Sequence, residues 1–322
     1  MKKLIVGPLV LGAALAFFVS GRAQDYPSRP IAIVVPYAPG GGVDRLARLV
    51  AEQLHQATSA PVIVENRPGA NGNIGAEYVA RSYPDGYTLL YAPPGPLVIN
   101  KLLYAKLNYD SDTFVPISLI ATSPNVLVVN PKVGADTIQQ LIAYAKAHPD
   151  RLNYASPGNG GTPHLSAELF KSLAGVKMLH VPYRGTGPLM TDVLSGNVDL
   201  TFSELGNVLQ HVRAHKLRAL AVGSEKRNPA LPDVPAMSEL LPGFASATWS
   251  GLVAPAGTPP AIVQRLFTTL AQSFKQAEAT KRVMEMSNLE AVVSTPEEMA
   301  HQMKSERERW SKVIREIGLT EK

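Results

Sequence analysis

The sequence has 322 residues, of which 45% are hydrophobic and 18% are charged. A chain of this length and composition can bury two hydrophobic cores, which excludes a disordered chain, a collagen-like chain and a small disulfide scaffold. The formal net charge is +5, but Lys2, Lys3 and Arg22 supply three of the surplus positive charges and precede every acidic residue. Phosphate binding needs clustered cations, and no Lys/Arg block follows, so we expect no nucleic-acid partner.

Residues 1–23 are typical of a secretory signal peptide. Lys2 and Lys3 precede an apolar run over residues 4–19, and Gly21 and Ala23 are the small residues of a cleavage site after Ala23. A membrane anchor is the alternative, but the run is shorter than the ~20 apolar residues of a transmembrane helix and contains Gly and Pro. We therefore expect export. The chain has no Cys, which excludes a disulfide framework, a thiol nucleophile and a lipid-anchored cysteine.

Short β-branched runs then alternate with helical periodicity. The expected order is strand 31–35, helix 43–54, strand 62–64, helix 74–82 and strand 88–91. Such alternation predicts an open α/β sheet with mainly parallel strands.

The same pattern restarts after residue 126 and predicts a second α/β lobe. Its expected strands cover residues 126–129, 153–155, 178–181, 200–202 and 217–222. Its expected helices cover residues 137–147, 163–173, 188–194 and 205–214.

The last third of the chain contains a return path. Four prolines in residues 228–243 indicate a stiff surface connector rather than a strand. A strand is expected over 249–254, followed by a helix with an apolar stripe from Ile262 to Phe274. The last helix is expected to begin at Thr295-Pro296-Glu297-Glu298, a capping box with Pro at the first helical position.

Two Gly-rich turns lie where a predicted strand leads into a predicted helix. The first turn and the start of its helix contain Tyr37, Ala38, Pro39, Gly40, Gly41, Gly42 and Asp44. The second contains Ser156, Gly158, Asn159, Gly160, Thr162 as the expected N-cap, and His164. Glycines let the backbone approach a ligand closely, and a helix N-terminus favours an anion. If the lobes face each other, the two turns converge on one cleft.

This pattern predicts a binding site for a small molecule with a carboxylate near each lobe. It is not a nucleotide loop, because the G-x-G-x-x-G and Gly-Lys-Ser/Thr spacings are missing. A third Gly-rich turn, which contains Asn71 and Asn73, is expected to line the same cleft. We expect no cofactor.

Several of these residues also have a structural interpretation. Asp44 is suited to be a first-turn acid that the helix field stabilises, and His164 to be a hydrogen-bonding wall residue. Arg184 is placed to pair with a ligand carboxylate or to be a solvated surface residue. His211 and His215 have the spacing of a metal pair, but the Glu of a zinc-protease helix is missing, so we expect no metal site.

A secreted hydrolase is the enzyme alternative, with Ser156 and His164 as the only Ser/His couple in the predicted cleft. No Gly-x-Ser-x-Gly elbow occurs. Pro157 also removes the backbone N–H that an oxyanion hole would need after the nucleophile. We therefore expect a binding protein rather than an enzyme.

The two Gly-rich turns, and motifs before and after them, resemble the Bug family of periplasmic solute-binding proteins, the receptors of tripartite tricarboxylate transporters. The matching motifs cover residues 26–31, 35–41, 64–70, 84–90, 153–160, 180–185 and 231–235. Two departures are Asn71, where the family more often has Gly, and Phe202-Ser203-Glu204, where a Phe-Asp-containing segment is more usual. We expect both to line the pocket.

The resemblance implies a type II periplasmic-binding-protein fold whose two lobes close on a ligand. With crossings near Asn125 and Trp249, lobe 1 comprises residues 24–124 and 250–322, and lobe 2 comprises residues 125–249. The resemblance implies that the two Gly-rich turns hold carboxylates through backbone amides and water. Tyr183, Ser203 and Asn207 complete the expected lining.

The expected function is therefore capture of a small carboxylate (a dicarboxylate, an amino acid or an aromatic acid) in the periplasm by a monomeric receptor. The receptor would deliver the carboxylate to the permease subunits of a tripartite tricarboxylate-type transporter. A ligand-sensing receptor for a membrane signalling protein uses the same fold and pocket and stays open as an alternative.

Overall fold

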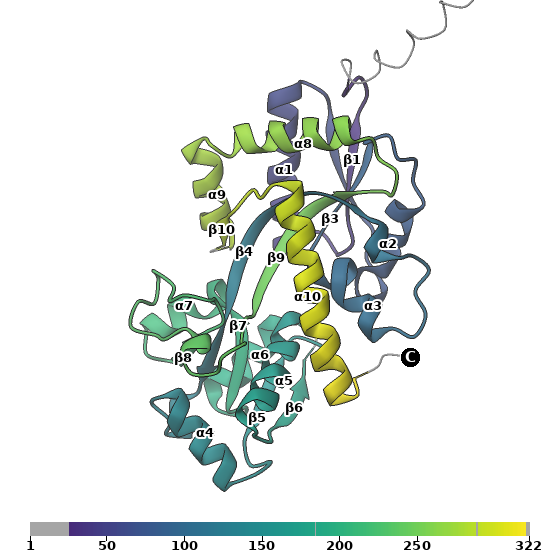
Figure 1. Ribbon diagram of the computed structural model, residues 1–322. Coiled ribbons are helices and arrows are strands. Elements are labelled where there is room, and N and C mark those ends of the chain that lie inside the picture. Colours follow the sequence, from purple (N-terminus) through teal and green to yellow (C-terminus); the bar gives the residue numbers. More distant parts are fainter. Residues whose placement is uncertain (1–25, 184, 288, 320–322) are drawn as a thin grey trace, which may run out of the picture.

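The computed structural model describes residues 26–183, 185–287 and 289–319 (Figure 1). The predicted signal peptide and Arg184 lie outside these residues. Within the described ranges, no helix combines the length and the apolar character needed to cross a bilayer.

The first lobe is built on three parallel strands. Strand β1 (Ile31–Val35) lies between β2 (Val62–Asn66) and β3 (Thr88–Ala92). Helices α1 (Gly42–Thr58) and α2 (Asn73–Ala80) follow β1 and β2. Ile31, Ile33 and Val35 of β1 are buried in a core that includes the apolar face of α1, as the alternating pattern predicts.

The second lobe repeats this arrangement. Strand β5 (Asn153–Ser156) pairs in parallel with β6 (Leu179–Pro182) and with β7 (Leu200–Glu204). The helices of this lobe are α4 (Ile138–Ala147), α5 (Thr162–Ala174), α6 (Thr186–Ser195) and α7 (Leu205–Arg213).

Two long strands run through both lobes (Figure 1). Strand β9 (Ala247–Ala254) pairs with β3 of the first lobe. Strand β4 (Val115–Val129) pairs with β9 along its first part, and with β7 and β8 (Arg218–Val222) of the second lobe along its last part. All four pairings are antiparallel, so the sheet is mixed, although the strands within each lobe run parallel. Asn125 lies in β4 and Trp249 in β9, and we keep these two positions as the proposed limits of the lobes.

The C-terminal elements return over both lobes. They are α8 (Pro260–Ser273), α9 (Ala277–Ser287), the short strand β10 (Glu290–Ala291) and α10 (Pro296–Ile317). Helix α10 begins with the predicted capping box, in which Thr295 Oγ1 accepts from the Glu298 amide and the Glu298 carboxylate accepts from the Thr295 amide. It packs on β4 and on α5, and so contacts both lobes.

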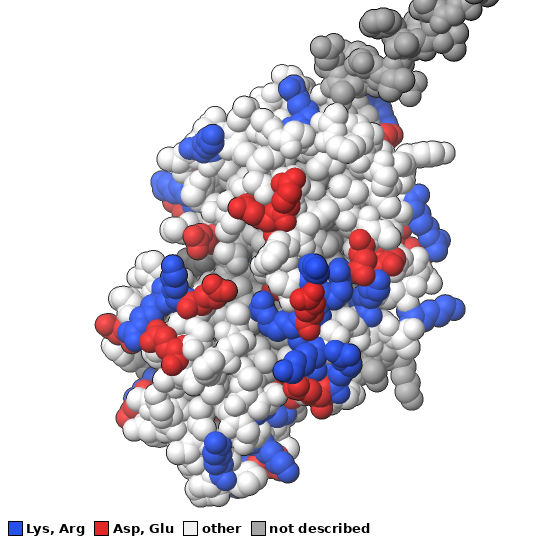
Figure 2. All heavy atoms as spheres, viewed as in Figure 1, with Lys and Arg blue, Asp and Glu red and all other residues white. Residues whose placement is uncertain are grey.

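Helix α10 also contacts η2 (Gly95–Ile99) and α3 (Asn100–Leu103), two short helices after β3. Lys101 pairs with Asp110 and Asp112, and Arg307 of α10 pairs with Asp112 as well. Figure 2 shows acidic and basic side chains interleaved over this part of the surface. These ion pairs connect α10 to the first lobe.

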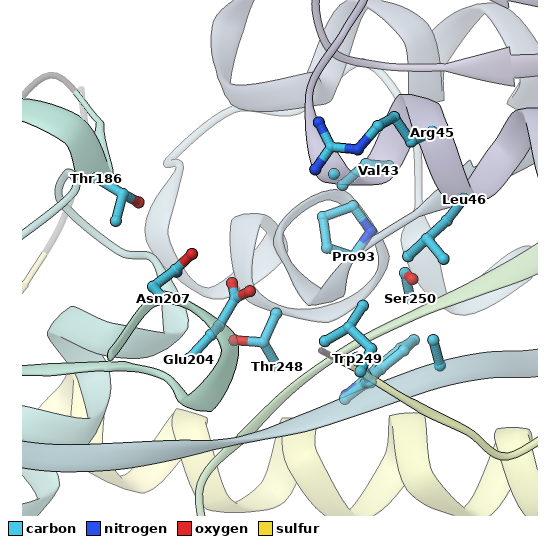
Figure 3. Close-up of a pocket in the computed structure, with 13 residues that line it drawn as sticks. Val43, Arg45, Leu46, Pro93, Thr186, Glu204, Asn207, Thr248, Trp249 and Ser250 are labelled. Carbon is cyan, nitrogen blue, oxygen red and sulfur yellow. The ribbon is translucent and has the colours of Figure 1, made fainter. Parts of the chain in front are cut away.

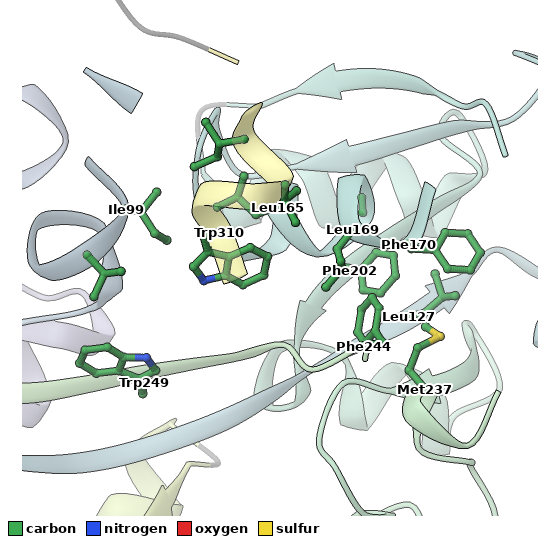
Figure 4. Packing of buried hydrophobic residues seen from close by; sticks show 14 of the residues in the cluster. Ile99, Leu127, Leu165, Leu169, Phe170, Phe202, Met237, Phe244, Trp249 and Trp310 are labelled. Carbon is green, nitrogen blue, oxygen red and sulfur yellow. The ribbon is translucent and has the colours of Figure 1, made fainter. Parts of the chain in front are cut away.

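One apolar cluster is shared between the lobes. Figure 4 shows Ile99 and Trp249 at one end and Phe170, Phe202 and Phe244 at the other, with Trp310 of α10 between them. The remaining short helices are η1 (Ala70–Gly72), η3 (Ser111–Thr113), η4 (Pro131–Val133) and η5 (Met237–Glu239).

Three sequence predictions need correction. Strand β4 begins at Val115, eleven residues before the predicted start, because Pro116 and Pro124 conceal it in the sequence pattern. The Pro-rich stretch 228–243 is not purely a surface connector, since Met237 is completely buried. Thr162 is not an N-cap: Gly161 takes that place and Thr162 is the first residue of α5.

Candidate ligand-binding site

A cavity of about 270 Å³ lies between the lobes, against the crossing strands. Its walls come from α1, from the N-terminal ends of α6 and α7, and from β9 (Figure 3). The lining residues are Gly42, Val43, Arg45, Leu46, Pro93, Ala121, Thr186, Glu204, Asn207, Thr248, Trp249, Ser250 and Leu289. Residues far apart in the sequence therefore meet in one small space whose lining is about half polar and half apolar.

The first Gly-rich turn reaches this cavity through the start of α1. Gly41 is the N-cap, with φ −72° and ψ 169°, and Gly42 is the first helical residue. A Cβ added at Gly42 would meet no atom within 4 Å. Because the first amides of a helix have no acceptor inside it, they are available to a ligand in the cavity. Tyr37 is half-buried, while Ala38, Pro39, Gly40 and Gly41 are exposed.

Asp44 holds the turn in place rather than facing the cavity. Its carboxylate accepts hydrogen bonds from the Gly40 amide at 2.9 Å, from Asn66 Nδ2 at 2.9 Å and from the Arg48 guanidinium at 3.1 Å. Burial acts to raise the pKa of Asp44, but these donors outweigh it and keep the pKa below its usual value. Asn66 Nδ2 also donates to the Tyr37 carbonyl. The structural interpretation of Asp44 therefore fits its contacts.

The second Gly-rich turn lies between the lobes but does not line this cavity. The Gly160 amide donates to His164 Nδ1 at 3.0 Å, and Gly160 has φ +73°. A Cβ at Gly160 would overlap Leu103 of α3, so this turn touches the first lobe. Gly158 faces open space and Asn159 is exposed. The start of α5 contacts the cavity wall indirectly, since Thr162 Oγ1 lies 2.6 Å from Oγ1 of the lining residue Thr248.

Ser156 and His164 do not form the couple that the hydrolase alternative requires. Ser156 is fully buried, and its Oγ bonds His180 Nε2 at 2.7 Å. The ring of His164 stacks on His180 at 4.1 Å, and His180 stacks in turn on Tyr154. Burial, with the neighbouring His180, lowers the pKa of His164 to about 4. His164 is therefore a neutral acceptor that positions the Gly160 amide.

The third Gly-rich turn forms its own polar cluster away from the lining. The side chains of Asn71 and Asn100 hydrogen-bond each other's segments, and Asn100 Nδ2 also donates to Asn73 Oδ1 at 2.7 Å. Tyr109 donates a second hydrogen bond to Asn73. The acceptor atom of Asn73 is thus used inside the first lobe.

Other predicted residues also separate into two groups. Asn207 lines the cavity. Ser203 and Tyr183 do not: Ser203 is buried in β7, and the Tyr183 hydroxyl donates a hydrogen bond to the Asp192 carboxylate at 2.6 Å. Burial and this hydrogen bond raise the pKa of Tyr183 to about 12.

Sequence reasoning missed Arg45, Thr186, Thr248 and Ser250, whereas Glu204 belongs to a segment that was expected to line the pocket. The second-lobe helices at the cavity are α6 and α7, not α5 as predicted. One signal for α7 was present in the sequence, because a predicted strand gives way to a predicted helix at Glu204-Leu205.

Comparisons with known proteins identify the family. Residues 46–319 match the profile of TctC, the tripartite tricarboxylate transporter family receptor. The chain is 37% identical over 317 residues to protein BugT of Bordetella pertussis, which covers 98% of this chain and 96% of BugT.

Solved structures of similar proteins have the same fold as this chain. "R. palustris Rpa4515 with adipate" has a TM-score of 0.78 and 37% identity, covering 92% of this chain and 99% of that one. MatC from Rhodopseudomonas palustris with bound malate has a TM-score of 0.74 and 32% identity, covering 90% and 100%. The predicted periplasmic-binding-protein fold is thereby confirmed. The family consists of receptors, so the prediction of a non-enzymatic binding protein is confirmed as well. The chain belongs to the TctC family of tripartite tricarboxylate transporter receptors, which includes the Bug proteins.

Proposed function

We propose that this receptor captures a small carboxylate in the cavity between its lobes and delivers it to the permease of a tripartite tricarboxylate-type transporter. The observation that carries the proposal is the position of Gly42: the first amide of α1 opens into a cavity that residues of both lobes enclose. Relatives that bind adipate and malate support a carboxylate as the ligand. Export by the N-terminal signal peptide would place the receptor in the periplasm.

Capture involves closure of the two lobes around the crossing strands β4 and β9. Arg45 and Gly42 lie on the first-lobe side of the cavity, and Thr186, Glu204 and Asn207 lie on the second-lobe side (Figure 3). Each lobe alone supplies part of the lining. A ligand that contacts both sides therefore favours the closed form by its extra affinity for that form.

The sharpest test removes one amide proton and little else. Gly42 is the first residue of α1, where Pro is well tolerated, and Gly41 before it already has the extended conformation that Pro requires. Gly42→Pro deletes the N–H, whereas Gly42→Ala keeps the N–H and adds a methyl group in open space. The pair isolates the contribution of one hydrogen bond.

Isothermal titration calorimetry of the mature chain with mono- and dicarboxylates, amino acids and aromatic acids should find a tight ligand. A hydrogen bond to a charged group is worth ~1.5–3 kcal/mol, so Gly42→Pro should weaken binding about 10- to 100-fold. Gly42→Ala should bind nearly as tightly as the wild type. Equal affinities of the two variants would refute the role of this amide.

A further inference from the structure

The two charged residues that line the cavity lie on opposite lobes. Arg45 of α1 is the cation and Glu204, at the junction of β7 and α7, is the anion (Figure 3). Arg45 Nη1 donates to the Gly40 carbonyl at 2.7 Å, which places its positive charge beside the first Gly-rich turn. The cavity is therefore chemically asymmetric, with a basic side chain on the first-lobe side and an acidic side chain on the second-lobe side.

Glu204 places an acidic side chain on the second-lobe side of the cavity. It is the N-cap residue of α7, but its carboxylate makes no capping hydrogen bond to that helix. Burial raises the pKa of Glu204 above its usual value, because it disfavours the charged form of the carboxyl group. A ligand carboxylate on the same side would add a second acidic group to this site, and two carboxyl groups in a confined space do not both ionise readily.

The immediate surroundings of Glu204 leave it in need of hydrogen-bond donors. Thr248 lines the cavity beside Glu204 (Figure 3), but its hydroxyl is hydrogen-bonded to Thr162, with 2.6 Å between the two Oγ1 atoms. Among the described residues, no Lys or Arg forms an ion pair with Glu204. A carboxyl group can take part in about four hydrogen bonds, so a ligand in the cavity can supply the donors that Glu204 lacks.

From this asymmetry we propose that the ligand is a small monocarboxylate whose other end carries N–H donors, as a primary amide or an ammonium group, rather than a dicarboxylate. Its carboxylate binds at the α1 amides and Arg45, and its N–H groups bind Glu204, with Asn207 and Thr186 beside them. The cavity volume of about 270 Å³ limits the ligand to a small metabolite. The inference rests on the proposed function and narrows its ligand class.

Isosteric ligand pairs test this directly, because they differ only in O⁻ against NH₂. Succinate is compared with succinamate, glutarate with glutaramate, and adipate with adipamate, by calorimetry at neutral pH. Wild-type protein should bind the best monoamide at least about tenfold tighter than its diacid, because juxtaposed like charges cost several kcal/mol. Glu204→Gln removes the charge at constant shape, and should abolish this preference by strengthening diacid binding about tenfold or more.

Glu225→Gln is the matched control, since Glu225 is an exposed acid of the second lobe that does not line the cavity. It should leave the amide-to-diacid ratio unchanged. Wild-type preference for the diacid, or the same ratio in Glu204→Gln, would overturn the inference while leaving the carboxylate receptor intact. An equal shift in Glu225→Gln would also overturn it, because general charge would then explain the effect. If the receptor proposal itself is wrong, a different result shows it: the acid then binds Gly42→Pro as tightly as it binds the wild type.

Discussion

Glu306 of α10 is a buried acid at the junction of the lobes, and its replacement should make the protein more stable at high pH. Glu306 is only 1% exposed. It lies beside the indole groups of Trp249 in β9 and Trp310 in α10. Gln302 donates to its Oε1 at 3.2 Å, but within the described chain Glu306 Oε2 and both indole nitrogens complete no hydrogen bond. Burial therefore dominates and raises the pKa of Glu306 from 4.5 to about 7, against smaller opposing effects of Trp249 and Arg309.

The sign and size of the effect follow from proton linkage. Between pH 4.5 and about 7, folded Glu306 keeps a proton that the unfolded chain has released, so the free energy of unfolding falls as pH rises. Each pKa unit corresponds to 1.36 kcal/mol, so the total loss by pH 8 is about 3 kcal/mol. Glu306→Gln resembles the protonated acid and has no such loss. Its stability relative to the wild type should therefore rise by about 3 kcal/mol between pH 4.5 and pH 8.

Denaturant unfolding at several pH values, followed by Trp fluorescence, measures this difference. The chain has two Trp residues, Trp249 and Trp310, and both lie beside Glu306. Glu308→Gln is the control, because Glu308 is an exposed acid on the same helix. Glu306→Gln and wild-type stabilities that change in parallel across this pH range would refute the reasoning.

Three further predictions concern the turns and the last helix. Gly160→Ala should lower the free energy of unfolding by more than ~1–2 kcal/mol, because φ is +73° and the new Cβ overlaps Leu103. The control Gly42→Ala should have little effect on denaturant unfolding. Equal stability of the two variants would contradict the close approach at Gly160. His164 should remain neutral down to about pH 4 in a titration of its imidazole NMR signals. The protein should also lose stability as pH falls from 6.5 towards 4, because only the unfolded chain takes up the proton in that range. Titration of the ring near pH 6.5 would show that it is not buried as described. Thr295→Ala should lower the free energy of unfolding by about 1 kcal/mol, because the N-cap hydrogen bond is lost. Thr295→Ser keeps the hydroxyl and should be as stable as the wild type. A loss of the same size in both variants would exclude the capping hydroxyl as the cause.

The sequence was informative where local chemistry determines structure. Gly-rich turns and the capping box at Thr295 are local patterns, and the helices begin within one or two residues of the predicted places. Strand β4 was mostly missed because Pro116 and Pro124 interrupt its pattern, while its pairing with β9 depends on residues more than a hundred positions away. Periodicity within a window carries no record of such a partner.

The site shows the same division. Gly42 and Asn207 were predicted and line the cavity, but the partner of Ser156 was wrong because β6 brings His180 to Ser156 across a strand pair. Glu204 was expected to line the pocket only as part of a segment that departs from the family pattern. Its place opposite Arg45 depends on how the lobes pack, which residue types alone do not determine.

A crystal structure of the mature chain with its tightest-binding acid would test the central claim most directly. A carboxylate oxygen is expected within hydrogen-bonding distance, about 3 Å, of the Gly42 amide nitrogen, with the ligand enclosed by both lobes. A ligand bound outside the cavity, or one inside it whose carboxylate lies away from the start of α1, would contradict the account.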